Sequence, residues 1–569
     1  MSLGFHLGLF IVQAQPLNVT VTGLLANLTD ENHNWKPFKS TNVTQTNGNL
    51  TISIITNNTQ KLFNRALLQT QLNTSDTARP VLTLDYASKH LSHPSNRKPV
   101  FVIEIRDIKN SKILWYAILK DTSGKLLNEP FTLPSKALNK PIEFRLYIIT
   151  EGGPSHSILS LKNLYVYRFG SSYNGGPIIT DPNIKVEVLF KGLKFPTSMA
   201  FLGPNDLLVL EKNNGTVQRI LNGTLLPKPV LDVNVAIQSE RGMEGIALTK
   251  NQSTNKTYVF LYFTETKSKD GEKGSFYRDL GNRLYRYELD DDKLVNPKLL
   301  LDLPSRPCCI HNGGKIAIGP DNNVYTVIGD AKGHHTKAQN NQTGPPPDGT
   351  SVIYRLTQDG DPAPGNPFGN KALINKFFAY GIRNSFGLDF DPVTGNLWDT
   401  ENGPGAADEI NLVEPGFNSG WAKIQGIWNT NASHPNSLGK IASSNNESLV
   451  DFDGRGKYSA PEFTWSFGGV GVTAVEFFNS TKFGKQYEND MFVGDYHKGY
   501  LYHFDLSKER DKLMIDGVLR DKASDNITEW QKAIFGQGFG AITDIKVGPD
   551  GHLYVLTYQG TIFRLVPST

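Results

Sequence analysis

The chain has 569 residues, 38% of them hydrophobic, and its 58 Lys and Arg residues nearly balance its 55 Asp and Glu residues. This length favours two domains, and the ordinary apolar content excludes a wholly disordered or membrane-embedded chain. The basic residues are dispersed along the chain, so a phosphate-binding surface is not indicated and nucleic acid is not an expected partner.

Residues 1–17 are a possible signal segment. Leu3 to Val12 are mostly apolar and lead into Val-Gln-Ala, a pattern of small residues typical of cleavage sites, although the usual basic residues are missing. The stretch is too short to span a bilayer, so no transmembrane segment is expected.

The chain also contains fifteen Asn-X-Ser/Thr sequons, more than chance supplies in an Asn-rich sequence. We therefore expect an extracellular or cell-surface, N-glycosylated protein; a biased composition without attached sugar is the alternative. The sequons begin at Asn18, Asn27, Asn42, Asn49, Asn57, Asn73, Asn214, Asn222, Asn251, Asn255, Asn341, Asn431, Asn446, Asn479 and Asn526.

Residues 18–170 are rich in Thr, Asn, Ser and Leu and show weak helical periodicity. Alternating strand patterns predict an antiparallel β-sandwich of the jelly-roll kind. Such a domain could contact glycan or a cell surface, or merely cover the rest of the protein. Residues 171–182 are predicted to be a linker. The clearest strand patterns are Asn49–Ile55, Val100–Arg106, Ile113–Leu119 and Ile142–Ile149.

Residues 183–569 repeat one pattern six times: an apolar run, a Gly/Asp/Asn turn and a second apolar run. Repeats of this length, each unable to bury its own faces, are typical of radially stacked β-sheets. The sequence therefore predicts a six-bladed β-propeller; a β-sandwich with ordinary turns is the alternative. The repeats are Pro196–Ile220, Gly242–Leu289, Gly313–Leu356, Tyr380–Leu412, Val472–Phe504 and Ile542–Val566.

The turns of these repeats are alike. Gly319 to Tyr325 and Gly548 to Tyr554 both begin Gly-Pro-Asp, continue with Asn or Gly, and end on Tyr. Pro and Asp start a turn and Asn or Gly accepts positive φ, which predicts β-hairpins at equivalent places.

The two cysteines are adjacent, at Cys308 and Cys309. An oxidising compartment favours a vicinal disulfide that stiffens the loop before His311, with buried free thiols as the alternative. A metal site would require more ligands.

The segment from His311 to Lys315 has the sequence His-Asn-Gly-Gly-Lys and directly precedes a repeat's first strand. Its glycines allow the backbone to approach a ligand, and an imidazole titrates near neutrality, as a general base requires. A structural histidine is the alternative.

The next repeats add charged groups. Arg383 and Asn384 begin the following repeat at the equivalent place and offer a fixed cation and an amide. One strand later, Gly403 and Pro404 form a turn followed by Asp408 and Glu409. Oxygen ligands in a loop are those that Ca²⁺ prefers; a turn with solvated acids is the alternative.

These segments, together with Gly416 to Trp421, resemble the motifs of the soluble quinoprotein glucose/sorbosone (aldose sugar) dehydrogenase family, in order and over about residues 185 to 569. The resemblance implies a six-bladed propeller that holds pyrroloquinoline quinone (PQQ) and Ca²⁺ and oxidises an aldose at C1 to its lactone, with an external electron acceptor. It implies His311 as the base, Arg383 and Asn384 as stabilisers of negative oxygen, and the Gly403 and Pro404 carbonyls as calcium ligands.

The chain departs from the family at the expected cofactor-binding positions. Glu240 replaces a frequent Gln, Glu244 stands in a usually apolar pair, and His497 aligns with a lysine that binds a cofactor carboxylate. The last repeat has Ala541 and Thr543 where glucose-oxidising members have two arginines. Losing these charge-assisted bonds costs on the order of 1.5 to 3 kcal/mol each.

Other residues of this chain could compensate at those positions. The candidates are Arg241, Lys315 and Lys498.

Two functions from different classes therefore remain open. The first is a secreted PQQ-dependent aldose dehydrogenase. The second is a non-catalytic extracellular glycoprotein that binds glycans or proteins, which the loss of the arginines supports. A propeller lactonase is a third option, but the sequence offers no additional ring of acidic ligands for it.

Overall fold

In the computed structural model the chain divides into two compact units, residues 1–171 and 172–569. The structure describes residues 176–568 except 252–253, 268–278, 306–309, 432–433, 443–448, 467–468 and 525–526; before residue 176 it describes only β-strands, mostly as backbone. The possible signal segment and the Cys308-Cys309 pair lie outside the described residues.

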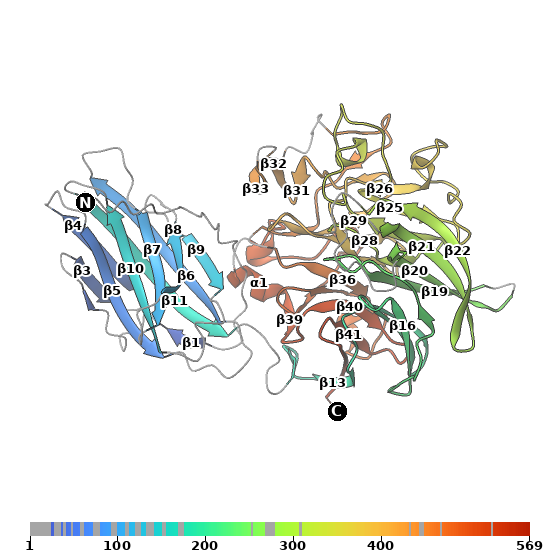
Figure 1. The fold of residues 1–569 in the computed structure, drawn as a ribbon, viewed down its shortest axis with the longest axis horizontal. Helices are drawn as coiled ribbons and strands as arrows, with labels where there is room; N and C mark the ends of the chain where they lie inside the picture. Colours follow the sequence, from blue (N-terminus) through green and yellow to red (C-terminus); the bar gives the residue numbers. More distant parts are fainter. Residues whose placement is uncertain are drawn as a thin grey trace. The chain divides into compact units, whose positions relative to one another are not determined.

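The first unit contains two sheets with antiparallel pairing throughout (Figure 1). The four strands that the sequence predicts most clearly coincide with β4, β7, β8 and β10; the packing of the sheets as a jelly roll stays a prediction. One sheet has the order β3-β4-β11-β6-β9 with β1 paired to β11, from β1 (Leu24–Asn27), β3 (Thr41–Thr46), β4 (Asn49–Thr56), β6 (Pro80–Ser92), β9 (Leu127–Thr132) and β11 (Ser155–Arg168). The other has the order β2-β5-β10-β7-β8, from β2 (Lys36–Pro37), β5 (Leu62–Gln71), β7 (Val100–Asp107), β8 (Ile113–Leu119) and β10 (Pro141–Thr150).

The second unit is a β-propeller. Its described residues form six sheets of four or more strands, and each predicted repeat supplies the first strands of one sheet. The six first strands, β14, β19, β23, β27, β36 and β40, contact one another in this order, and β40 contacts β14, so the ring closes. The propeller prediction is confirmed.

The sheets that begin with β14, β19 and β23 come first along the chain. They consist of β14 (Pro196–Gly203), β15 (Asp206–Glu211), β16 (Thr216–Leu221), β17 (Thr224–Leu225) and β18 (Leu231–Asp232); of β19 (Met243–Lys250), β20 (Thr257–Thr266), β21 (Asp279–Asp290) and β22 (Lys293–Leu303); and of β23 (Ile316–Ile318), β24 (Val324–Ile328), β25 (Val352–Leu356), β26 (Phe377–Tyr380), β30 (Phe417–Asn418) and β34 (Lys457–Tyr458).

The remaining three sheets complete the ring. They consist of β27 (Ser385–Phe390), β28 (Leu397–Glu401), β29 (Asp408–Val413) and β35 (Phe463–Trp465); of β36 (Val472–Phe477), β37 (Met491–Asp495), β38 (Tyr500–Phe504), β39 (Ile534–Gln537) and β12 (Ile178–Ile179); and of β40 (Ile542–Val547), β41 (Leu553–Thr557), β42 (Thr561–Pro567) and β13 (Ile184–Lys191).

Shorter elements lie in the connections. They are the small sheet of β31 (Ile424–Gln425), β32 (Trp428–Asn431) and β33 (His434–Ile441), the helix α1 (Ile527–Ala533), and the 3-10 turns η2 (Lys337–Gln339), η3 (Ile374–Lys376), η4 (Lys485–Tyr487) and η5 (Gly517–Leu519).

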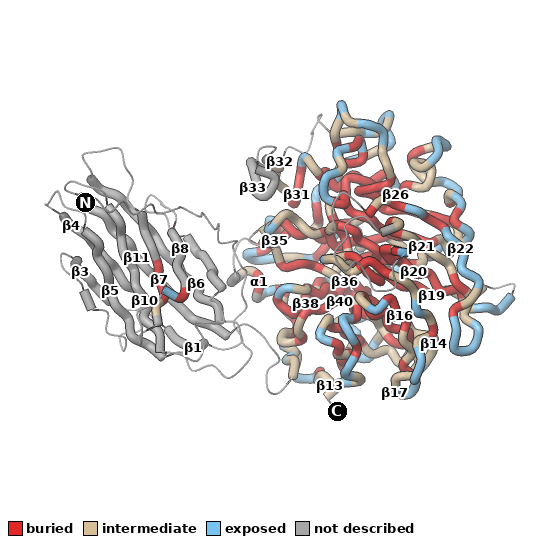
Figure 2. Tube along the Cα trace, in the orientation of Figure 1, coloured by how far each residue is buried: buried red, intermediate tan, exposed pale blue. Residues whose placement is uncertain are grey.

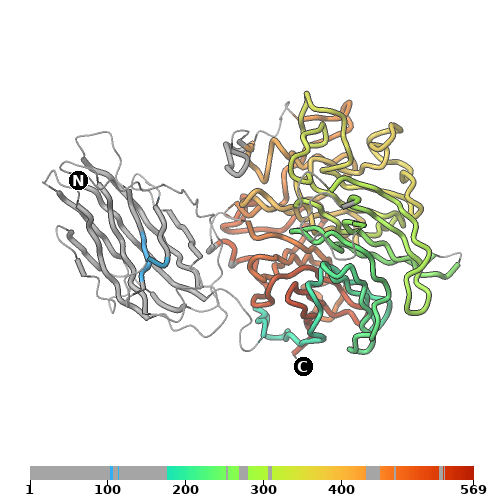
Figure 3. Tube along the Cα trace, in the orientation of Figure 1, coloured from blue at the N-terminus to red at the C-terminus, as the bar shows by residue number. Residues whose placement is uncertain are grey.

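The ring is closed by strands from opposite ends of the unit. β13 pairs with β42, the last strand of the chain, and Figure 3 shows this early segment beside the red C-terminal one. β12, inside the predicted linker 171–182, pairs with β39 and so belongs to a propeller sheet. Because both pairings join segments hundreds of residues apart, they resist opening of the ring and cover edge strands.

The core consists of apolar layers between neighbouring sheets (Figure 2). On β15, Leu207 and Val209 face the sheet of β40, whereas Leu208 and Leu210 face the sheet of β19. Successive strand residues point to opposite faces, and both faces are buried here. This explains why the strand forms a continuous apolar run in the sequence.

The repeated hairpins have the expected chemistry. Asp321 accepts hydrogen bonds from the Asn323 amide (3.1 Å) and the Tyr325 hydroxyl (3.0 Å). Asp550 does the same with the His552 amide (3.2 Å) and the Tyr554 hydroxyl (2.8 Å). One side chain thus fixes the turn and fastens it to the following strand, as an Asx turn does.

Candidate active site

A cavity of about 450 Å³ lies where the starts of the six first strands converge. A lining residue lies at the start of each strand or, for β23, directly before it, so positions far apart in sequence meet around one space. These six residues are Thr197, Glu244, Lys315, Phe386, Thr473 and Thr543. The other lining residues are Lys212, Ser239, Glu240, His311, Arg383, Asn384, Asn402, Gly403, Gly405, Asp408, Gly469, Gly471, Tyr496, His497 and Tyr558.

His311 is held through one ring nitrogen. Its Nδ1 lies 2.5 Å from Oδ1 of Asp330, and the other oxygen of Asp330 accepts a hydrogen bond from the Trp421 indole (2.8 Å). Burial raises the pKa of Asp330, but the hydrogen bond and charge of His311, with smaller contributions, lower it overall. An ionised carboxylate at Nδ1 leaves Nε2 to act on a ligand, which is the arrangement of an oriented base.

A glycine allows this arrangement. Gly329 precedes Asp330, and a Cβ atom there would lie 2.3 Å from the Arg383 carbonyl oxygen and 2.8 Å from the His311 carbonyl oxygen. Only glycine permits such an approach of backbone to backbone. The loops that carry His311 and Arg383 are therefore brought together at Asp330, whose amide donates to the Arg383 carbonyl (2.9 Å).

Glu240 links the same loops from another sheet. Its carboxylate accepts hydrogen bonds from the His311 backbone amide and from Nδ2 of Asn384 (3.2 Å). Oδ1 of Asn384 accepts from the Gly313 amide (3.3 Å). Glu240 therefore orients the loop of His311 and the amide of Asn384.

Arg383 lies beside this cluster. Its Nη1 donates to the Asn402 carbonyl (2.6 Å), its guanidinium lies 5.3 Å from the Trp421 ring, and its Nε is buried without a partner among the described residues. Burial lowers the pKa of Arg383, and nearby carboxylates, first Asp330, oppose that effect. A guanidinium at a cavity wall is suited to a ligand oxygen.

The predicted calcium turn is held by Asp408. One oxygen of Asp408 accepts from the Gly403 amide (2.8 Å) and the other from the Gly471 amide (2.6 Å). Burial raises the pKa of Asp408, and the hydrogen bonds from these two amides oppose that effect. Its carboxylate therefore fixes the turn, which leaves backbone carbonyls as the more accessible ligands.

Glu409 lies behind the cavity. It accepts hydrogen bonds from Gln425 (2.7 Å) and from the Gly426 amide, and burial raises its pKa to about 8. Within the described part of the chain, the one group of three His, Cys, Asp or Glu ligands close enough to hold a metal is Asp490, His503 and Asp505, outside the cavity lining.

Lys315 is paired at the base of the cavity. Its ammonium forms a buried salt bridge with Asp544, which also accepts from the Ser198 hydroxyl and the Met199 amide, both at 2.8 Å. Burial lowers the pKa of Lys315, and the charge of Asp544 opposes that effect.

His497 contributes an imidazole to the wall, and burial followed by the charge of Lys498 lowers its pKa to about 4. It is therefore neutral near pH 7.

The structure brings most predicted site residues into this lining and leaves four outside it. The four outside are Arg241, Lys498, Pro404 and Glu409. Sequence reasoning missed Asp330 as the partner of His311, Trp421 as the partner of Asp330, and Lys212 as a lining cation. Asp330 follows a strand end with Gly329, a signal that could have indicated a close approach, whereas Lys212 has no such signal.

Known proteins are similar to this chain over its propeller unit. The family model described as Glucose / Sorbosone dehydrogenase matches residues 193–564. The aldose sugar dehydrogenase YliI of Escherichia coli (strain K12) is 26% identical over 399 residues, which cover 68% of this chain and 93% of that protein. Quinoprotein glucose dehydrogenase B of Acinetobacter calcoaceticus is 28% identical over 264 residues, covering 43% of this chain and 53% of that protein.

Solved structures show the same fold. A putative oxidoreductase (glucose dehydrogenase) from Thermus thermophilus has a TM-score of 0.50 and 26% identity, covering 67% of this chain and 100% of its own. The apo-form of the soluble aldose sugar dehydrogenase from Escherichia coli has a TM-score of 0.52 and 24% identity, covering 68% and 99%. Because the family model spans most of the chain, this protein belongs to the glucose/sorbosone dehydrogenase family, the family of the PQQ-dependent aldose sugar dehydrogenases.

Proposed function

We propose that this chain oxidises an aldose at C1 to its lactone, with PQQ as the hydride acceptor, Ca²⁺ at the turn of Gly403 and Pro404, and an external acceptor that reoxidises the cofactor. The observation that carries the proposal is the contact between His311 Nδ1 and Asp330 in the wall of the cavity. A scaffold that only binds has no evident need for an oriented base beside a buried cation.

The residues around His311 fit a quinone bound at their end of the cavity. The volume of about 450 Å³ lies in the range of small-molecule sites. Arg383 lines the cavity, so its guanidinium can donate to an oxygen of a bound cofactor or substrate. When bound, the quinone would take up the hydride that leaves C1.

The chain's own residues would manage the proton and the charge. His311 would accept the proton of the C1 hydroxyl at Nε2, while Asp330 stabilises the resulting imidazolium. Arg383 and Asn384 would stabilise the oxygen as it becomes negative, and their fixed hydrogen bonds mean that they need not reorganise. A hydride and one proton thus leave the sugar, which becomes the lactone.

For calcium, we propose the carbonyl oxygens of Gly403 and Pro404 as ligands. The carboxylate of Asp408 supports this by holding the turn through two amide hydrogen bonds. The described lining contains no additional cluster of acidic ligands, so a lactonase is less well supported.

Titration calorimetry with PQQ, with and without Ca²⁺, tests the proposal. We expect binding that calcium strengthens, and dye-linked oxidation of an aldose by the loaded protein. Binding weaker than about millimolar, near −4 kcal/mol, would exclude the dehydrogenase function.

The second candidate is a non-catalytic extracellular glycoprotein. Thr543, at a position where glucose-oxidising members have an arginine, donates its hydroxyl to the Pro196 carbonyl (3.0 Å) and so offers no cation to an anionic cofactor. Failure to bind PQQ together with retention of the full chain on immobilised polysaccharide would favour this function, and would assign glycan contact to the N-terminal unit if changes there abolish retention.

We further propose that the protein is exported and N-glycosylated. Among the described residues of the propeller, four sequon asparagines are exposed: Asn214, Asn222, Asn255 and Asn479. No helix in the described part of the chain is long and apolar enough to cross a membrane. Enzymatic deglycosylation of the protein from its own cells should lower its mass; an unchanged mass would argue against attached glycans.

A further inference from the structure

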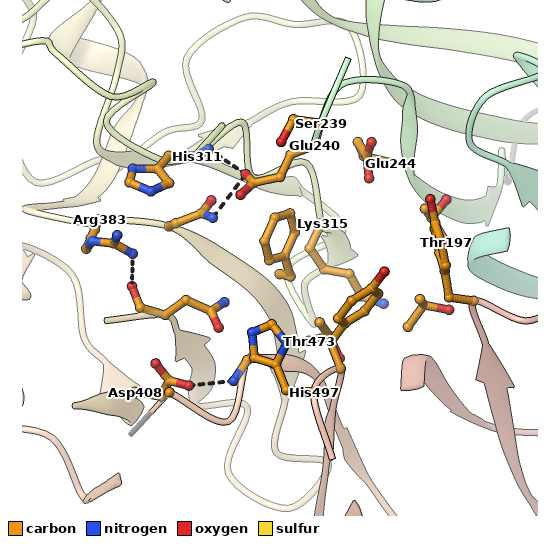
Figure 4. A pocket seen from close by; sticks show the side chains of 18 of the residues that line it. Thr197, Ser239, Glu240, Glu244, His311, Lys315, Arg383, Asp408, Thr473 and His497 are labelled. Carbon is orange, nitrogen blue, oxygen red and sulfur yellow. Dashed lines mark hydrogen bonds between the residues drawn. The ribbon is translucent and has the colours of Figure 1, made fainter. Parts of the chain in front are cut away.

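At the end of the cavity that lies away from His311, two threonine hydroxyls and two lysines are already engaged within the protein. In Figure 4, His311 and Arg383 lie on one side, and Glu244 and Thr197 on the other. The Thr197 hydroxyl donates to the Met243 carbonyl (2.7 Å), and the Thr543 hydroxyl donates to the Pro196 carbonyl (3.0 Å). Both hydroxyl protons are therefore committed to backbone oxygens.

The lysines of the lining are committed as well. Lys212 donates to the carbonyl oxygens of Ser239 (2.7 Å) and Arg241 (2.6 Å) and to Oδ1 of Asn213 (3.2 Å), which accounts for its three N–H bonds. Lys315 pairs with Asp544. An anion at this end would meet positive charge nearby but few N–H groups aimed at it.

Glu244 is the exception. It lines the cavity, and its Oε1 is buried without a hydrogen-bond partner among the described residues. Burial raises the pKa of Glu244 to about 8; Lys212 lowers it and Glu240 raises it further. The ionised form would be costly, whereas the protonated form gains a hydrogen-bond donor.

We propose that Glu244 is a protonated carboxylic acid at neutral pH that donates a hydrogen bond to a carboxylate of bound PQQ. The inference rests on the proposed function, because it requires the quinone to enter this cavity. A hydrogen bond from a neutral acid to a carboxylate is charge-assisted and short, and it substitutes in part for the arginines absent at Ala541 and Thr543. Binding of the quinone neither forms nor breaks a covalent bond between heavy atoms. Glu244 only keeps its proton or takes one up from solvent.

Proton uptake follows from this arrangement. Above about pH 8 the free protein carries an ionised Glu244, which repels the carboxylate, so binding requires a proton from solvent. Affinity should therefore be constant below pH 7 and fall as the pH rises through 8.

Other titratable groups that face Glu244 come from several elements. They are Lys212 after β15, Glu240 before β19, Tyr262 on β20, Tyr496 after β37 and Tyr558 after β41. Burial raises the pKa values of Tyr262, Tyr496 and Tyr558, so these tyrosines stay neutral across the same pH range. Lys212 could also weaken anion binding at high pH, so the experiment must separate it from Glu244.

The test is titration calorimetry of the full chain with PQQ from pH 6 to 9, in paired buffers with different ionisation enthalpies. The wild type should take up close to one proton at pH 9 and lose about tenfold in affinity between pH 7 and 9. Glu244→Gln keeps an N–H donor but cannot ionise, so it should take up no proton and bind about tenfold more tightly than the wild type at pH 9.

Glu414→Gln, which changes an exposed glutamate outside the cavity lining, is the matched control and should keep the pH dependence of the wild type. Proton uptake that persists in Glu244→Gln would assign the effect to Lys212 or another group and overturn the inference. Binding by the wild type without proton uptake would overturn it while leaving the proposed function intact. Absence of PQQ binding at every pH would overturn both.

Discussion

Nδ1 of His311 lies 2.5 Å from Oδ1 of Asp330 at the open end of the hairpin of β23 and β24, because His311 precedes the first strand and Asp330 follows the second. The second oxygen of Asp330 is fixed by Trp421, so the carboxylate cannot rotate away without losing a buried hydrogen bond. These two contacts fix the orientation of the His311 ring, so that Nε2 is available at the cavity as a base.

Replacing the base tests its role directly. We expect His311→Ala to lower turnover of the PQQ-loaded protein by about 10²- to 10⁴-fold, the usual contribution of a general base, and to leave quinone affinity nearly unchanged. Dye-linked oxidation and calorimetry measure the two effects. His503→Ala, outside the cavity lining, is the control; substantial residual oxidation by His311→Ala would show that another group is the base.

Asp330→Asn tests the orientation of that base. The amide oxygen can still accept from Trp421, but the amide nitrogen then faces Nδ1 and favours the wrong tautomer of His311. We expect kcat to fall by about 10- to 100-fold with little change in KM. Asp348→Asn breaks the comparable pair with His334 outside the cavity lining and should leave kcat unchanged; an equal loss in both variants would indicate a structural effect.

His497 makes stability depend on pH. Its pKa is lowered to about 4 in the folded state by burial and by Lys498, against about 6.5 when unfolded, so between these values the unfolded state binds more protons. The side chain of His497 is exposed to solvent at the cavity wall, so screening reduces this contribution. The contribution is complete above pH 6.5 and is lost as the pH falls toward 4.

Thermal melting at several pH values measures this effect. The melting temperature of His497→Asn should fall less steeply than that of the wild type between pH 6.5 and 4. Parallel curves would mean that the ring titrates in the folded state as it does in the unfolded chain.

Asp408 is expected to support calcium binding without serving as its main ligand. Asp408→Ala removes acceptors from the buried amides of Gly403 and Gly471, which costs about 1 to 3 kcal/mol each. Chelation should weaken PQQ binding in the wild type, and added Ca²⁺ should restore it.

In Asp408→Ala, high Ca²⁺ should restore part of the lost PQQ affinity, because the carbonyl ligands remain. Complete insensitivity of the wild type to chelation would contradict a calcium site at this turn.

The position of Gly245 tests how closely the first strands of neighbouring sheets approach one another. A Cβ atom there would lie 1.9 Å from the Gly314 carbonyl oxygen, a backbone atom on the neighbouring sheet. We expect Gly245→Ala to destabilise the propeller by about 2 kcal/mol or more, because one strand must move. Gly203→Ala, where nothing lies within 4 Å, should melt nearly as the wild type does. Equal melting temperatures for both variants would contradict the close packing of β19 against the segment before β23.

The sequence indicated the propeller because each sheet is a local pattern. The hairpins at Asp321 and Asp550 are built from residues within a few positions of each other, and the apolar runs between them are buried on both faces. Such features can be recognised in any single repeat. The motif of His311 could likewise be found because its glycines stand next to it in the chain.

What the sequence could not decide is which partners each side chain meets across the ring. Asp408 looked like a metal ligand, but it binds the amides of Gly403 and Gly471, and the second amide lies 63 positions away. Lys315 looked available to a cofactor, but Asp544, 229 positions away, neutralises it. Local spacing therefore determined the sheets and the residue types at the cavity, whereas only closure of the ring decided their charge states and hydrogen bonds, because those depend on neighbours supplied by other sheets.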